Sequence, residues 1–140
     1  MDNTYRIVML VLLAYSAYTD IKCREIMMIP VYACMLVGLL GPIAYGSEWK
    51  GIVYGAIPGV LMLAFSFISR GSVGEGDAYL FIVLGMLTGI RMTLDVMVVS
   101  SLTAALYSGI NLLTGRLKKK DCIAFVPFVL TGYIGALIVA

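Results

Sequence analysis

The fold is decided by apolar stretches such as residues 51–69, which read GIVYGAIPGVLMLAFSFIS and carry no charged side chain. A helix needs roughly 20 such residues to cross the hydrocarbon core of a bilayer. Similar runs recur along the 140 residues, of which 61% are hydrophobic and 13% are charged. A soluble domain would carry roughly 25% charged residues. The composition therefore predicts an all-α integral membrane protein.

Polar breaks divide the chain into six apolar spans. We expect transmembrane helices near residues 4–20, 27–46, 51–69, 78–92, 94–114 and 122–140. No linker between them is long enough to separate domains, so residues 1–140 are expected to form one bundle of six transmembrane helices. The first span lacks a basic leading region and a small-residue cleavage site. We therefore expect it to be retained as a helix and not removed as a signal peptide.

The basic residues predict the orientation of this bundle, because cytoplasmic loops carry the excess of Lys and Arg. If the first, third and fifth loops share one side, that side holds Lys22, Arg24, Arg70, Arg116, Lys118, Lys119 and Lys120. The other side holds only Arg6, Lys50 and Arg91. We therefore expect the N- and C-termini outside the cell and the first, third and fifth loops in the cytoplasm. The run of lysines at 118–120 is expected to anchor the chain beside anionic membrane lipid.

Several function classes are disfavoured by composition alone. A net charge of +2 is too small to indicate nucleic acid as a partner. The chain has no histidine, which removes the commonest general base and the commonest metal ligand. Its three cysteines form no C-x-x-C pair, so we expect no metal site. Neither a metal nor an organic cofactor is expected.

Two aspartates at the edges of apolar spans are the strongest candidates for chemistry. Asp20 ends the first span, and Asp77 begins the fourth within Gly74-Glu75-Gly76-Asp77. An acidic group at membrane depth is costly and indicates a functional site. The predicted topology brings both acids to the cytoplasmic face, where they are expected to form a carboxylate pair. Gly74 and Gly76 lack Cβ atoms and are expected to let another backbone approach the pair.

Three segments carry a family resemblance. The Gly74–Asp77 segment matches the G-x-G-D signature of intramembrane aspartyl proteases, and residues 20–26, DIKCREI, resemble the first loop of type IV prepilin peptidases. Residues 123–128, IAFVPF, resemble a Pro-Phe segment on the last helices of that family. The chain departs from the family pattern at two places. Tyr79 replaces a usual lysine, and Met27-Met28 replaces a usual Pro-Asn.

The resemblance implies a short, peptidase-only enzyme in the plasma membrane that removes the basic leader of a prepilin or pseudopilin precursor at the cytoplasmic face. It implies that Asp20 and Asp77 are the catalytic residues and that the protein serves pilus or secretion machinery. Supporting or substrate-binding positions would be Gly74, Gly76, Lys22, Arg24 and Pro127.

The chemistry of such a pair requires one ionised and one protonated carboxyl group, because close like charges do not both ionise. Asp20 lies near a helix C-terminus, where the helix dipole disfavours negative charge, and Asp77 lies near a helix N-terminus, where it favours it. These positions predict that Asp20 more often holds the shared proton. Lys22 and Arg24 would oppose that effect, and a first helix that continues past Asp20 would remove its basis.

Other interpretations stay open. Asp77 could be the N-cap of the fourth span, and Asp20 could be a solvated loop residue paired with Lys22 or Arg24. Pro127 could kink or begin the last helix, or line a cleft. Arg91 and Asp95 are expected to form a pair in an external loop. The whole chain could instead be a small transporter or channel subunit that uses Asp20 and Asp77 as ion or proton ligands, or a catalytically silent subunit of a pilus assembly machine.

Overall fold

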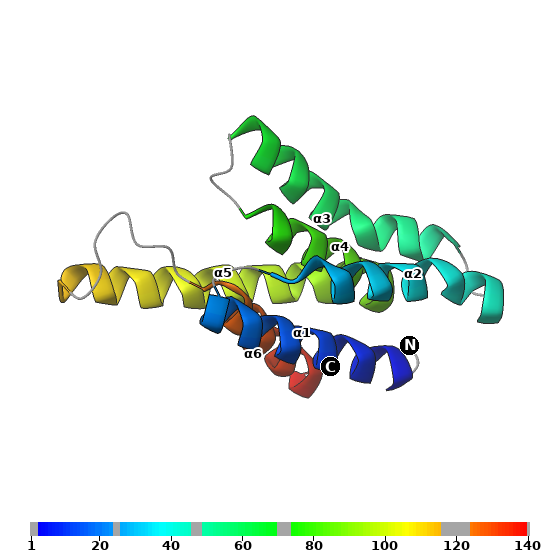
Figure 1. Ribbon diagram of the computed structural model, residues 1–140, viewed down its shortest axis with the longest axis horizontal. Coiled ribbons are helices and arrows are strands. Elements are labelled where there is room, and N and C mark those ends of the chain that lie inside the picture. Colours follow the sequence, from blue (N-terminus) through cyan, green and yellow to red (C-terminus); the bar gives the residue numbers. More distant parts are fainter. Residues whose placement is uncertain (1–2, 24–25, 46–48, 70–73, 116–123, 140) are drawn as a thin grey trace.

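The computed structural model describes residues 3–23, 26–45, 49–69, 74–115 and 124–139 (Figure 1). These residues form six α-helices and, in the described ranges, no strand. The helices are α1 (Asn3–Cys23), α2 (Met28–Tyr45), α3 (Trp49–Ile68), α4 (Glu75–Thr88), α5 (Ile90–Leu113) and α6 (Val126–Val139). The prediction of an all-helical chain with six helices is confirmed, and each helix overlaps its predicted span.

The boundary between the fourth and fifth spans was predicted wrongly. The chain breaks at Gly89, which has φ 87° and ψ 165°, a conformation that favours glycine. Arg91 and Asp95 therefore do not lie in a loop. Both lie in the first two turns of α5, one helical turn apart, and both are exposed. The prediction failed because polar side chains on an exposed helix face resemble a polar break between two helices.

Two helices in the described part of the chain, α3 and α5, are long and apolar enough to cross a membrane. Shorter apolar helices run from Met28 to Leu40 and from Val126 to Val139. Large apolar side chains are exposed on both long helices, among them Leu61 and Phe65 on α3 and Leu102 and Leu106 on α5. A helix that exposes so many apolar side chains fits an apolar solvent better than water.

The centre of the bundle is α4, which contacts α1, α2, α3 and α5. It is buried on nearly every side, with Leu80, Phe81, Val83 and Leu84 each at most 1% exposed. A helix that is apolar all round has its stable place in the core. In Figure 1, α3 lies along one side of α4 while α1 and α6 lie side by side on the other. This arrangement holds the N-terminus of α4 in a fixed place.

The closest helix crossing is between α3 and α4 and depends on glycine. A Cβ atom on Gly55 would overlap the carbonyl of Gly85, and one on Gly59 would overlap the backbone of Ile82. Gly55 and Gly59 are four residues apart, so they lie on one face of α3. Small residues at this spacing let two membrane helices approach closely. The crossing therefore ties α4 to the long apolar helix that precedes the G-x-G-D segment.

Candidate functional site

Asp20 lies in the last turn of α1, which continues three residues beyond it to Cys23. Its side chain is only 8% exposed. Its Oδ2 accepts a hydrogen bond of 3.0 Å from the backbone N–H of Val126, the first residue of α6. The interpretation of Asp20 as a solvated loop residue is therefore wrong. A buried carboxylate needs such a partner, and here the partner comes from the far end of the chain.

The start of α6 explains why this N–H is available. The first N–H groups of a helix have no intrahelical partner. The carbonyl of Phe125 accepts the N–H groups of Phe128 and Val129, and Pro127 has no N–H to satisfy. Asp20 accepts the N–H of Val126. Pro127 therefore occupies the first turn of α6 and begins this helix without kinking it, as proline does at such positions.

Asp77 lies in the first turn of α4, at the third helical position. Gly74 occupies the N-cap position with extended dihedral angles, φ −61° and ψ 124°, and its carbonyl accepts the N–H of Asp77 at 3.1 Å. The interpretation of Asp77 as the N-cap is therefore wrong. Its neighbour Glu75 is exposed, whereas Asp77 is partly buried. The structure thus turns one acid of the motif toward solvent and the other toward the bundle.

The two glycines of the motif serve close approach and not positive φ. A Cβ on Gly74 would lie 3.0 Å from Oδ2 of Asp77, so this carboxyl group packs against the bare Cα of the N-cap residue. A Cβ on Gly76 would lie 3.0 Å from Cδ1 and 3.2 Å from Cβ of Ile26. Ile26 ends the segment that contains Asp20. The glycine at 76 thus brings the Asp20 segment onto the first turn of α4.

The electrostatics couple the two acids. Burial and, as the smaller cause, the nearby Asp20 carboxylate together raise the pKa of Asp77 to about 7. Asp77 itself lies outside the membrane-spanning segments, because the predicted fourth span begins at residue 78 and α4 is not one of the two helices long and apolar enough to cross a membrane. This direction is opposite to the dipole-based prediction that Asp77 is the more readily ionised acid. That prediction neglected burial, which is the larger of the two causes of the raised pKa.

Of the two basic residues predicted to support the site, the structure describes Lys22. Lys22 is exposed, and its Nζ lies 5.8 Å from the ring centroid of Tyr18, in the geometry of a cation–π contact. The described contact of Lys22 is therefore with Tyr18, which is also exposed. Arg24, Glu25 and Lys118–Lys120 lie outside the described residues. Tyr79 packs edge-on against Tyr32 of α2 with ring centroids 6.2 Å apart.

Sequence reasoning missed Ser16, which lies one helical turn before Asp20. Ser16 is 1% exposed, and its Oγ has no hydrogen-bond partner among the described residues. Four other buried hydroxyls each donate to a carbonyl three or four residues earlier: Thr19, Thr88, Thr93 and Ser100. Residues four apart share a helix face, so Ser16 and Asp20 lie on the same face of α1. That spacing was readable in the sequence, although the burial was not.

Comparisons relate the chain to known proteins. A model of the type IV leader peptidase family matches residues 7–109, which include both aspartates. A prepilin leader peptidase/N-methyltransferase from Bacillus subtilis (strain 168) is 34% identical over 133 residues, covering 91% of this chain and 52% of the relative. The chain therefore spans about half the length of that curated relative. No solved structure matches this chain.

Proposed function

Because this chain belongs to the type IV leader peptidase family, we propose that it is an intramembrane aspartyl endopeptidase that removes the short basic leader of prepilin-like precursors. The observation that carries the proposal is the Asp20–Asp77 pair. One carboxylate is buried and held by a backbone N–H, and the other has a pKa of about 7 next to it. Two coupled carboxyl groups with different environments are the requirement for aspartic peptide hydrolysis.

The proton is assigned to Asp77. Its raised pKa favours the neutral acid near neutral pH. Asp20 accepts the N–H of Val126 at the N-terminus of α6, where the helix dipole stabilises negative charge. In the proposed reaction Asp20 removes a proton from water while Asp77 donates its proton to the scissile carbonyl oxygen. The tetrahedral gem-diol intermediate then collapses and the peptide C–N bond breaks. The leaving amine receives the proton that Asp20 had taken, and Asp77 recovers its own proton from a hydroxyl of the gem-diol, so both acids return to their starting states.

The attacking water is proposed to lie beside Ser16. A buried polar group normally has a partner in the protein or in an ordered water. The Ser16 hydroxyl has none among the described residues, and it is on the same face of α1 as Asp20. Side chains four residues apart on a helix are about 5–6 Å from one another, a separation that one water can bridge. Ser16 would thus position the water that Asp20 activates.

The proposed setting is a plasma-membrane protein with six spans, both termini outside and the aspartates at the cytoplasmic face. The support is the loop charge asymmetry of the sequence and the two long apolar helices, α3 and α5. The substrate would be a prepilin or pseudopilin precursor with an apolar helix in the membrane and a basic leader in the cytoplasm. The products would pass to pilus or secretion assembly machinery.

The test is co-expression of the full chain with a candidate prepilin and measurement of the precursor's N-terminus by mass spectrometry. Asp20→Asn and Asp77→Asn should each abolish cleavage. Glu75→Gln is the matched control, because Glu75 is an exposed acid two residues from Asp77, and this variant should cleave normally. Cleavage at the wild-type level by either aspartate variant would overturn the mechanism.

A further inference from the structure

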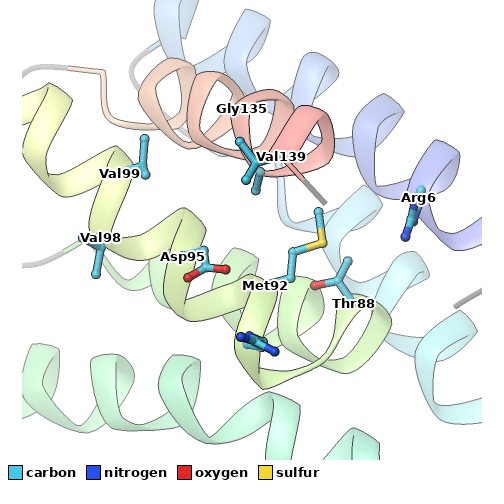
Figure 2. Close-up of a pocket in the computed structure, with 10 residues that line it drawn as sticks. Arg6, Thr88, Met92, Asp95, Val98, Val99, Gly135 and Val139 are labelled. Carbon is cyan, nitrogen blue, oxygen red and sulfur yellow. The ribbon is translucent and has the colours of Figure 1, made fainter.

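A second polar region lies at the other end of the bundle from the aspartates. It is a cavity of about 750 Å³ formed by the first turns of α1 and α5, the end of α4 and the last turns of α6 (Figure 2). Asp20 and Asp77, by contrast, lie in the last turn of α1 and the first turn of α4. The cavity is therefore separate from the candidate active site, and nothing in the proposed peptidase mechanism uses it.

Three charged side chains line this cavity. They are Arg6 of α1, and Arg91 and Asp95 of α5. Within the described residues none of the three forms an ion pair, and the buried Nε of Arg6 has no hydrogen-bond partner. The cavity thus offers two guanidinium groups and one carboxylate whose hydrogen-bonding capacity is not used by the protein. Arg6 is half-buried, and its buried Nε is costly to leave without a partner unless a ligand satisfies it, whereas Arg91 and Asp95 are exposed and free to reach a ligand.

The remaining wall is apolar. Met92, Val98 and Val99 of α5 lie on one side, and Val139 of α6 lies on the other, as Figure 2 shows. Val98 and Val139 are 58% and 89% exposed, so the wall continues onto the outer surface of the bundle. α5 is one of the two helices suited to crossing a membrane. A ligand of this cavity can therefore keep its head between the charges and its apolar body along the lipid-facing surface.

We propose that this cavity binds a phospholipid whose headgroup carries both a phosphate and a primary ammonium, as phosphatidylethanolamine does. The phosphate would accept hydrogen bonds from the Arg6 and Arg91 guanidinium groups, which match phosphate geometry. The ammonium would donate to the Asp95 carboxylate. A quaternary ammonium has no N–H to donate, and a glycerol headgroup has no positive charge to offer Asp95. The three protein charges thus match one headgroup class better than the others.

The experiment uses the full chain, purified in detergent and mixed with equal amounts of phosphatidylethanolamine, phosphatidylcholine and phosphatidylglycerol of identical acyl chains. Native mass spectrometry reports which lipid is retained. We expect phosphatidylethanolamine to be retained most. Arg91→Gln should lower its retention roughly tenfold, the effect of one charge-assisted hydrogen bond. Asp95→Asn should remove the preference over phosphatidylglycerol.

The matched control is Lys50→Gln, which removes an exposed cation of α3 that the predicted topology places on the same side of the membrane but that does not line the cavity. It should leave the retention of all three lipids unchanged. Arg91 and Asp95 are exposed, so their variants are expected to fold, and thermal unfolding followed by circular dichroism checks this. Equal retention of the three lipids by the wild type, a preference for phosphatidylglycerol, or an equal loss in Lys50→Gln would each overturn the proposal.

Discussion

The backbone N–H of Val126 donates a 3.0 Å hydrogen bond to the Oδ2 of Asp20, joining residues 106 positions apart. The bond satisfies a free N–H at the start of α6 and brings the positive end of that helix to the Asp20 carboxylate. Asp20 therefore caps α6 in addition to its proposed role as the base. Substitution on either side of the bond can separate these two roles.

We expect Val126→Pro to remove the donor and leave α6 intact, because proline is favoured at the first position of a helix. Phe125, which precedes it, is outside the helix and can take the extended conformation that a following proline requires. Losing a hydrogen bond to a charged group should lower the free energy of unfolding by about 1.5–3 kcal/mol. Val126→Ala keeps the N–H but removes buried methyl groups, because Val126 is 0% exposed, so it measures the loss from packing alone. A Val126→Pro variant as stable as the wild type would show that the bond contributes nothing.

The pKa of Asp77 predicts how cleavage depends on pH. If Asp77 supplies the proton, the rate should fall as pH rises through about 7, where this acid ionises. In the unfolded chain Asp titrates near ~3.9, so the folded state holds this proton more tightly. Stability should therefore decrease as pH rises from about 4 to about 7 and then level off. Unfolding of wild type and Asp77→Asn across this range checks the sign, since the variant should lack that decrease.

The contact between Gly76 and Ile26 predicts a pair of coupled substitutions. Gly76→Ala places a Cβ about 3 Å from two Ile26 atoms, of which the Ile26 Cβ is not free to rotate away. Such overpacking costs typically about 1–3 kcal/mol, and it should also displace the Asp20 segment and slow cleavage. Ile26→Gly in the same chain removes both contacting atoms, including the Cβ that alanine would keep, and should restore part of both losses. A double variant no better than Gly76→Ala would disprove the contact. Gly51→Ala is the control, since a Cβ there meets nothing within 4 Å.

Much of the fold could be predicted from the sequence, because six apolar spans separated by polar breaks are compatible with few arrangements other than six helices. It failed at Gly89, where a single glycine turns the chain without a polar loop. At the site, the G-x-G-D motif located Asp77 and the end of the first span located Asp20. The expectation that Asp77 is readily ionised was wrong, since burial is a tertiary effect that a local helix dipole does not contain, and it raises the pKa of Asp77. Ser16 was missed for the same reason.

The α3–α4 crossing predicts a sharp contrast between two glycines of α3. Gly55→Ala would drive a Cβ into the carbonyl of Gly85, which is backbone and has no rotamer to change. We expect the two helices to separate and the free energy of unfolding to fall by more than about 3 kcal/mol, the upper end of the usual cost of overpacking. Cleavage should be lost as well, because α4 carries Asp77. Gly51→Ala, one turn earlier on the same helix, should be neutral or slightly stabilising. Thermal unfolding of the two variants in one detergent compares them directly, and similar midpoints would contradict this crossing.

The Ser16→Ala variant distinguishes two interpretations of the Ser16 hydroxyl, one in which it holds a water beside Asp20 and one in which it has no hydrogen-bond partner. If a water joins Ser16 to Asp20, the variant should lower kcat roughly tenfold, the effect of one lost hydrogen bond near 1.4 kcal/mol, with KM nearly unchanged. The unfolding free energy should also fall slightly. Without such a water, alanine removes an unpaired buried polar group and the protein should become more stable. Ser100→Ala is the control, because Ser100 is equally buried but donates to the Met97 carbonyl. A more stable Ser16→Ala enzyme with wild-type kcat would exclude the positioning role and leave Asp20 to hold the water without help from its own helix.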